Sequence, residues 1–194
     1  MRAEGPALAG HVVRDGVRIA YEVFGTSGPV LVLLPCWIIV HARSWKAQIA
    51  DLAQDCRLVV IDGRGNGASD RPRGFEAYSY PELVGDALAV MDHLAITECT
   101  LFGFSKGGPQ AALIAAARPE QVKAAVLIAP TGPSTPAERQ AREAAFLARL
   151  DRHEGWDKRN AWHIRDDCAD FVRFFFQRMF PEPHSTKQIE DAVA

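Results

Sequence analysis

The chain alternates short, continuous apolar runs with segments of helical periodicity, and this rhythm constrains its fold more than any other feature. Apolar runs without polar alternation are typical of strands that are covered on both faces. Strands separated by helices favour a parallel sheet with right-handed crossovers. We therefore expect an α/β fold, a mostly parallel sheet flanked by helices. The expected strands are residues 30–34, 58–61, 99–102 and 124–128.

The segments around these runs complete the expected sheet and its helices. Asp15-Gly16 lies between two alternating segments, 11–14 and 17–24, which predicts a hairpin. Residues 79–94 are the clearest helix, because apolar side chains recur on one face and Ser79 and Glu82 can form a capping box. The other helices expected between strands are residues 44–53 and 106–117.

The pattern changes after Pro130, where a loop-like stretch is followed only by helical candidates. These are residues 136–150, 168–180 and 185–193. The change in pattern predicts two parts, a sheet-containing core over residues 1–133 and a helical segment over residues 134–194.

Composition excludes several classes of function. The 194 residues are 48% hydrophobic and 24% charged, as expected of a soluble globular protein. The net charge of −2, without a sustained basic run, argues against nucleic-acid binding. No apolar stretch is long enough for a signal peptide or for the roughly 20 residues that span a bilayer, so we expect a cytoplasmic protein without a membrane partner.

The cysteines are too widely spaced for a zinc or redox motif. We therefore expect no metal site and no cofactor, and we interpret the cysteines as small, buried, reduced residues. They are Cys36, Cys56, Cys99 and Cys168.

The strongest local motif is Gly103-Phe104-Ser105-Lys106-Gly107, here called the elbow. It follows an expected strand and opens an expected helix, which is the context that gives a Gly-x-Ser-x-Gly motif its meaning. Such a turn forces the central residue into a strained conformation and brings the flanking positions together, so that only small residues such as Gly103 and Gly107 fit. We expect Ser105 to be a nucleophile, with the helix N-terminus beneath the developing oxyanion.

Two further segments stand in order before the elbow. Residues 33–37 read Leu-Leu-Pro-Cys-Trp, and residues 62–69 read Asp-Gly-Arg-Gly-Asn-Gly-Ala-Ser. With the elbow, they make the region from about residue 17 to residue 130 resemble the α/β-hydrolase superfamily, in its esterase and haloperoxidase-like branch. The first segment lies at the place of the family's His-Gly-x oxyanion loop, and the second is similar to its Asp-x-Arg-Gly-x-Gly-x-Ser loop.

The resemblance implies a small-molecule acyl substrate and an oxyanion hole made by the backbone N–H groups of Lys106 and Trp37. A serine at the elbow argues against the haloalkane and epoxide branches, which use an aspartate. Pro35-Cys36 replaces the family's His-Gly, and this departure leaves Cys36 open as a packing residue or a reactive thiol.

The polar residues near these motifs have simpler expected roles. Asp62, Arg64 and Ser69 are interpreted as holding their loop together, with Arg64 paired to Asp62 or Asp70. Because adjacent residues at a strand–helix junction point in different directions, the Lys106 side chain is expected to face solvent or a pocket rather than to form a Ser–Lys dyad.

The sequence offers no evident position for the acid and base that would activate Ser105. The family's chain order is Ser, then an acid, then His, each after a later strand, and no strand is expected after residue 128. The later candidates are interpreted mainly as surface residues of a helical cap. The histidines are His153, His163 and His184, and the acids are Asp151, Asp157, Asp166, Asp167, Asp170 and Asp191. The earlier histidines, His11, His41 and His93, come in the wrong order.

These observations favour a truncated serine hydrolase in which residues 134–194 are the cap, the last strands are missing, and the acid and base lie beyond residue 194. Little or no turnover is then expected from this chain alone. The alternative is a non-catalytic ligand-binding or regulatory module on the same fold. A purely structural scaffold has the least support, because the strain of an elbow serves no purpose in it. The identity of the substrate and the oligomeric state stay open.

Overall fold

A computed structural model describes residues 5–37, 41–132, 134–182 and 186–193. The chain forms two compact units, Met1–Gly132 and Pro133–Ala194, which are described separately below.

The first unit is built on a six-stranded sheet of order β1-β2-β4-β3-β5-β6. The last four of these strands in sheet order pair in parallel, and β1 and β2 form an antiparallel hairpin whose second strand pairs antiparallel with β4. The expected mostly parallel α/β sheet is thus confirmed. The strands are β1 (Leu8–Arg14), β2 (Val17–Phe24), β3 (Val30–Leu33), β4 (Arg57–Ile61), β5 (Cys99–Phe104) and β6 (Val122–Ile128).

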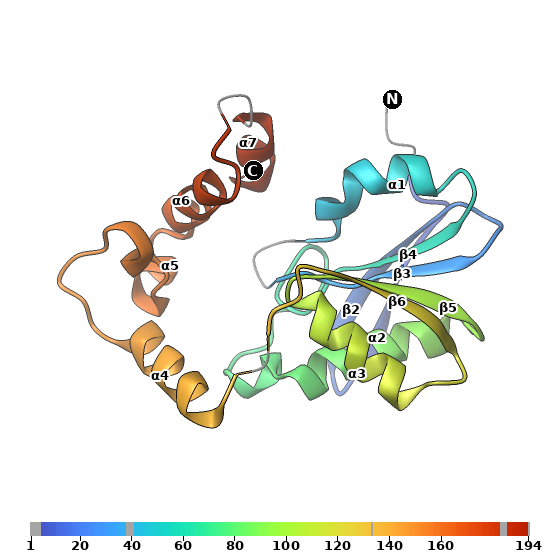
Figure 1. Cartoon of the computed structure of the whole chain (residues 1–194), viewed down its shortest axis with the longest axis horizontal. Coiled ribbons are helices and arrows are strands. Elements are labelled where there is room, and N and C mark those ends of the chain that lie inside the picture. Colours follow the sequence, from blue (N-terminus) through green and yellow to red (C-terminus); the bar gives the residue numbers. More distant parts are fainter. Residues whose placement is uncertain (1–4, 38–40, 133, 183–185, 194) are drawn as a thin grey trace. The chain divides into compact units, whose positions relative to one another are not determined.

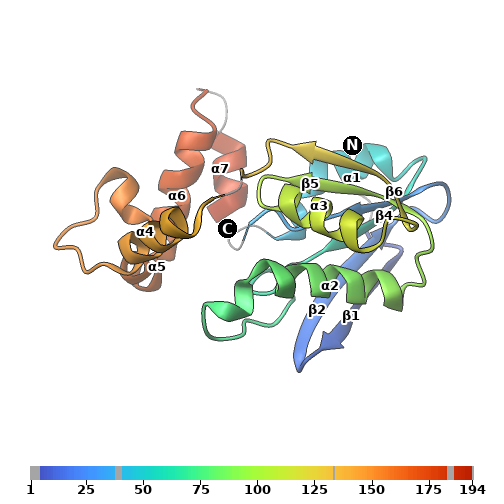
Figure 2. The same ribbon diagram turned by 60° about the horizontal axis from the view of Figure 1, so that its bottom comes forward.

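Helices cover both faces of this sheet (Figure 1). The 3-10 turn η1 (Ala42–Trp45) and α1 (Lys46–Leu52) lie on one face, and α2 (Tyr80–His93) and α3 (Gly107–Ala117) lie on the other. In Figure 2, α2 and α3 run side by side along that second face. Val32 and Leu34 pack toward α2 and α3, whereas Leu31 and Leu33 pack toward α1. This two-sided burial explains the unbroken apolar runs.

The start of α2 differs from the sequence prediction. Ser79 is the N-cap residue, but its side chain makes no capping hydrogen bond. The Glu82 carboxylate instead binds the guanidinium groups of Arg14 and Arg64. The predicted capping box is therefore wrong, because ion pairs from distant segments engage the glutamate.

Strand β6 forms one edge of the sheet, and its apolar side chains are poorly covered. Val126, Leu127 and Ile128 are 38%, 45% and 40% exposed, although the neighbouring strand β5 alternates between buried and half-buried residues. Among the described strands, β6 pairs with β5 alone.

The second unit contains only helices among its described residues, as the sequence predicts. Thr135 and Glu138 form a reciprocal capping box at the start of its first helix. Phe171 and Val172 are its buried apolar side chains, and Asn160 is a buried N-cap whose amide donates to the Ala148 carbonyl at 2.8 Å. The elements are α4 (Pro136–Leu147), η3 (Gly155–Lys158), α5 (Ala161–Asp166), α6 (Cys168–Met179) and α7 (Thr186–Val193). Within the described parts of both units, no helix has the length and apolar character needed to cross a membrane.

Candidate functional site

The elbow joins the end of β5 to the start of α3, and Ser105 is its apex. Ser105 has φ +52°, a left-handed conformation that a residue with a side chain adopts at a cost. Its N–H donates to the Ile128 carbonyl at 2.9 Å, and its own carbonyl accepts from Gly108 and Thr131 at 3.0 and 3.1 Å. The expected strain at the serine is therefore present, and hydrogen bonds on both sides hold it.

Close backbone approach explains the small residues that flank Ser105. A Cβ on Gly103 would lie 2.3 Å from the Gly107 carbonyl oxygen, so the two positions are in contact as the sequence predicts. A Cβ on Gly107 would lie 3.1 Å from the Pro35 carbonyl oxygen, and one on Gly108 would lie 2.6 Å from the Pro130 Cβ. The first turn of α3 thus packs directly against β5 and the loop after β3.

The Lys106 backbone is suitably placed to donate to an oxyanion. Lys106 is the residue immediately before α3, and no described residue accepts a hydrogen bond from its N–H. Unsatisfied N–H groups at a helix start carry the positive end of the helix dipole. The Lys106 N–H is therefore available for its predicted role as an oxyanion donor.

The loop after β3 is held by two side-chain amides. Asn66 donates from Nδ2 to the Trp37 carbonyl at 2.9 Å, and Gln110 donates from Nε2 to the Pro35 carbonyl at 3.1 Å. The Gln110 Oε1 atom is buried without a hydrogen-bond partner among the described residues. These amides fix the backbone that carries the second predicted oxyanion donor, the N–H of Trp37.

Cys36 lies within the same loop and is only 5% exposed. Burial raises the pKa of its thiol above the ordinary value, although hydrogen bonding with Ser44 acts in the opposite direction. Because the thiolate is the reactive form, this environment favours the packing role over the reactive thiol.

Asp62 and Ser69 hold the glycine-rich loop together, as expected. The Asp62 carboxylate accepts from the N–H groups of Ala42 and Ala68 at 2.7 and 2.9 Å. The Ser69 hydroxyl donates to the Asp62 carbonyl at 2.7 Å and accepts from the Ala20 N–H at 2.8 Å. These contacts tie β2, the glycine-rich loop and the start of η1 together.

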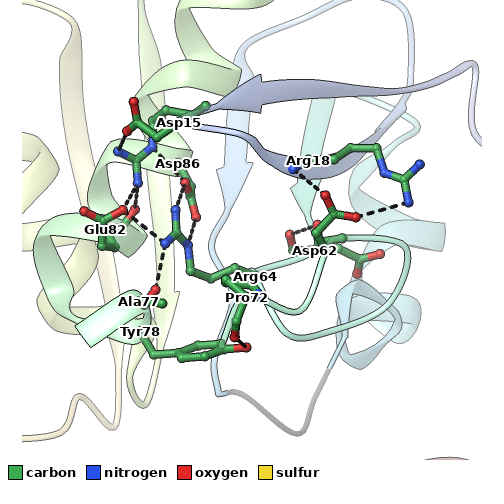
Figure 3. Close-up of polar contacts among 12 residues, drawn as sticks. Asp15, Arg18, Asp62, Arg64, Pro72, Ala77, Tyr78, Glu82 and Asp86 are labelled. Atoms are coloured by element: carbon green, nitrogen blue, oxygen red, sulfur yellow. Dashed lines mark hydrogen bonds and ion pairs between the residues drawn. The ribbon is translucent and has the colours of Figure 1, made fainter. Parts of the chain in front are cut away.

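Arg64 does not pair with Asp62 or Asp70, so that prediction is wrong. Its guanidinium reaches across to α2 and donates from Nε and Nη2 to Asp86 at 2.6 and 2.7 Å, with Glu82 3.0 Å from Nη1 (Figure 3). Arg64 and Asp86 are each 2% exposed. The two nearer aspartates are already engaged, Asp62 by backbone N–H groups and Asp70 by Arg18, whereas the buried Asp86 carboxylate requires cationic partners.

The two carboxylates of this network favour the charged form of both guanidinium groups. Burial on its own lowers the pKa of Arg64, but the hydrogen bonds and charge of Asp86 outweigh it and raise that pKa above the ordinary value. Arg14 from β1 donates to the same carboxylate at 2.9 Å. Two cations and two carboxylates thus fix the glycine-rich loop against α2.

The Lys106 side chain lies beside α2 rather than on the serine. Its Nζ atom is 5.7 Å from the centroid of the Tyr80 ring, and burial lowers the pKa of the amine. The Tyr80 hydroxyl lies 3.4 Å from Oγ1 of Thr131, whose N–H binds the Ser105 carbonyl. The Lys106 side chain was expected to face either solvent or a pocket, and it faces a pocket. No described contact forms a Ser–Lys dyad.

The candidate base residues are not joined to Ser105 in the described parts of the chain, where no histidine hydrogen-bonds to it. In the second unit, His163 Nε2 lies 2.8 Å from Asp170 Oδ2 and its ring stacks on His153 at 4.8 Å. Hydrogen bonding with Lys158, then with His163, lowers the pKa of Asp170. His184 lies outside the described residues, as does the side chain of Asp191.

The cysteines are all free, but they are not all buried. Cys36 and Cys99 are buried and Cys56 is half-buried, whereas Cys168 is exposed at the start of α6. The prediction of a buried role is therefore wrong for Cys168, because the first turn of an amphipathic helix offers it no covering element. Within the described ranges, no three His, Cys, Asp or Glu side chains gather to hold a metal ion.

Sequence reasoning missed three residues that shape this site. Asn66 and Gln110 support the loop after β3, and Asp86 neutralises Arg64. The sequence did contain an indication of the role of Asp86, since a carboxylate inside the apolar face of a helix needs a partner. It contained no indication for Asn66 and Gln110, because their contacts join segments distant in sequence.

A mostly parallel sheet that carries a strained serine between a strand and the following helix defines the class of α/β proteins to which this chain belongs. Residues 29–188 match the protein family described as alpha/beta hydrolase fold. The chain belongs to this family.

Individual relatives match part of their own length. "Epoxide hydrolase 4" of Mus musculus is 33% identical over 148 residues, which cover 74% of this chain and 41% of that protein. "3-oxoadipate enol-lactonase 2" of Acinetobacter baylyi is 31% identical over 139 residues, covering 72% and 50%. A crystal structure of a hydrolase from Pseudomonas aeruginosa PA01 has a TM-score of 0.74 at 23% identity, covering 96% and 66%. The chain thus spans half or less of these two curated relatives.

Proposed function

We propose that this chain carries the nucleophile of a serine hydrolase that acts on a small ester or related acyl substrate. The observation that supports this most is the left-handed backbone of Ser105 at the junction of β5 and α3. In the proposed reaction, the Ser105 oxygen bonds to the carbonyl carbon, the proton passes to a base, and the alcohol leaves. Water then attacks the acyl-serine and releases the acid.

Stabilisation of the tetrahedral intermediate is proposed to come from backbone donors. The Lys106 N–H, which no described residue engages, is the first donor, and the N–H of Trp37 is the second. Such a donor is worth roughly 3 kcal/mol in the transition state. The amide of Asn66, bound to the Trp37 carbonyl, supports the second donor.

The chemistry of serine favours acyl transfer over epoxide opening, even though one relative is named an epoxide hydrolase. Attack of a serine oxygen on an epoxide would give an ether, which water does not readily hydrolyse. Attack on an ester or lactone gives an acyl-serine, which water does cleave. The relative named an enol-lactonase is consistent with this class.

We propose that the second unit is the cap of the hydrolase, corresponding to residues 134–194. The base and acid of the triad are proposed to lie in a further part of the protein. Because the base takes the Ser105 proton during acylation, both acylation and the later release of the acid require those additional residues.

A fluorophosphonate probe, which reacts with activated serines, tests the proposal. We expect labelling of the intact protein, which contains the proposed base and acid, and none of its Ser105→Ala variant. Ser27→Ala is the matched control, because Ser27 is exposed in the loop before β3, and it should label like the wild type. Absence of labelling in the wild type, or equal labelling of Ser105→Ala, would count against a serine hydrolase.

The absence of a histidine bonded to Ser105 among the described residues favours one alternative, a ligand-binding module without catalysis. This alternative predicts saturable binding of small esters, no covalent labelling, and unchanged affinity in Ser105→Ala.

A further inference from the structure

The side chain next to the proposed nucleophile is a cation in an unusual position. Lys106 follows Ser105 directly, and its side chain is half-buried instead of extending into solvent. Its ammonium lies over the Tyr80 ring, with Nζ 5.7 Å from the centroid. Lysines at the start of a helix ordinarily project into water, because both desolvation and the helix dipole oppose a buried positive charge there.

No protein carboxylate compensates this charge in the described structure. The other cations of the same region, Arg14 and Arg64, bind Asp86 and Glu82. Lys106 forms no ion pair with any described residue, and the ring beneath it offers only a weaker attraction. Consistent with this, burial lowers the pKa of Lys106. The site therefore has an uncompensated positive charge next to the elbow.

The surroundings of Lys106 contain neutral groups suited to an anion. Lys106 lines a small cavity with Trp37 and Asn66, two residues of the proposed oxyanion region, and with Arg64, whose charge is paired with Asp86 and Glu82. The hydroxyl of Tyr80, whose ring lies beneath the ammonium, is 3.4 Å from the Thr131 hydroxyl. Hydroxyl groups and an ammonium can all donate to a carboxylate, and hydrogen bonds to charged groups are stronger than neutral ones.

We infer that Lys106 binds a carboxylate on the acyl substrate, so that the preferred substrates are monoanionic esters or lactones rather than neutral ones. This inference rests on the proposed function, because Lys106 directly follows the proposed nucleophile Ser105 in the sequence. Lys106 is then a specificity-determining residue, with its backbone and its side chain serving different parts of the same substrate.

Binding of two matched esters to the Ser105→Ala chain tests this inference without requiring turnover. Monomethyl glutarate carries one carboxylate, and dimethyl glutarate is neutral but of similar shape. Isothermal titration should show roughly ten- to a hundredfold tighter binding of the monoanion. Lys106→Met should abolish this preference, and Lys106→Arg should retain part of it. Lys123→Met, at an exposed lysine of β6, is the control and should leave the preference intact.

The preference should also fade as the pH rises through the lowered pKa of Lys106, because only the ammonium attracts a carboxylate. Circular dichroism of each variant separates loss of binding from loss of folding. Equal affinity for the two esters, no binding of either, or an unchanged preference in Lys106→Met would overturn the inference. Failure of probe labelling at Ser105 would instead overturn the proposed function, so the two results are distinguishable.

Discussion

Gly103→Ala should be the most damaging small substitution in the elbow. The new methyl carbon would lie 2.3 Å from the Gly107 carbonyl oxygen and 2.8 Å from the Gly108 Cα. Since these are backbone atoms, no side-chain rotation relieves the clash, and the start of α3 must retreat by about 1 Å to reach ordinary contact. Overpacking of this kind costs about 1–3 kcal/mol, and we expect the upper end.

The size of the stability loss expected for Gly103→Ala can be compared with that of substitutions at two other glycines. A Cβ on Gly107 would meet the Pro35 carbonyl oxygen at 3.1 Å, so Gly107→Ala should cost about 1 kcal/mol. A Cβ on Gly132 would meet nothing within 4 Å, so Gly132→Ala should stay within about 0.5 kcal/mol of the wild type.

Urea or thermal denaturation measures this series directly. For about 3 kcal/mol, the Tm of Gly103→Ala should fall by roughly 10 °C. In the intact protein, the reaction of Gly103→Ala with a phosphonate should also slow by about a hundredfold, because the Lys106 N–H moves by about 1 Å. Equal stability of Gly103→Ala and Gly132→Ala would refute the steric account of the elbow.

Other contacts give three further predictions. Arg64→Ala should destabilise the chain by about 3–5 kcal/mol in urea denaturation, because it leaves buried carboxylate charge less compensated, whereas Arg18→Ala, at an exposed pair, should cost under about 1 kcal/mol; equal effects would contradict the buried network. Asn66→Ala should slow phosphonate labelling of the intact protein by about tenfold, since it frees the loop that carries the second proposed donor, and labelling at the wild-type rate would exclude that positioning role. Lys158 and His163 lower the pKa of Asp170, so the carboxylate stabilises the second unit above the ordinary carboxyl pKa, and this stabilisation is lost as the pH falls through the lowered pKa. Asp170→Asn should remove this acid dependence from far-UV melting curves. An acid dependence equal to that of the wild type would contradict the prediction.

The sheet and the elbow were predictable because their causes are local. The apolar run 30–34 needs burial on both faces, and Gly103, Ser105 and Gly107 describe one tight turn. Both signals lie within a few adjacent residues, so a single sequence suffices.

The polar partners were not predictable in the same way. Arg64 is two residues from Asp62 and six from Asp70, yet it binds Asp86 on the next helix. Which carboxylate is available depends on how the loop folds back, and the sequence alone does not contain that information. In the same way, Glu82 forms ion pairs with Arg14 and Arg64 and does not form the predicted capping box.

The most direct test of the account is to locate the covalent intermediate. The intact protein, with the proposed base and acid present, would be mixed with p-nitrophenyl acetate, quenched in acid within the burst phase, digested, and analysed by mass spectrometry. We predict an acetyl group on the peptide that contains Ser105, and its absence in Ser105→Ala. Acetylation confined to Cys36 or to the Lys106 amine, or no acetylation while the native fold persists, would contradict the claim that Ser105 is the nucleophile.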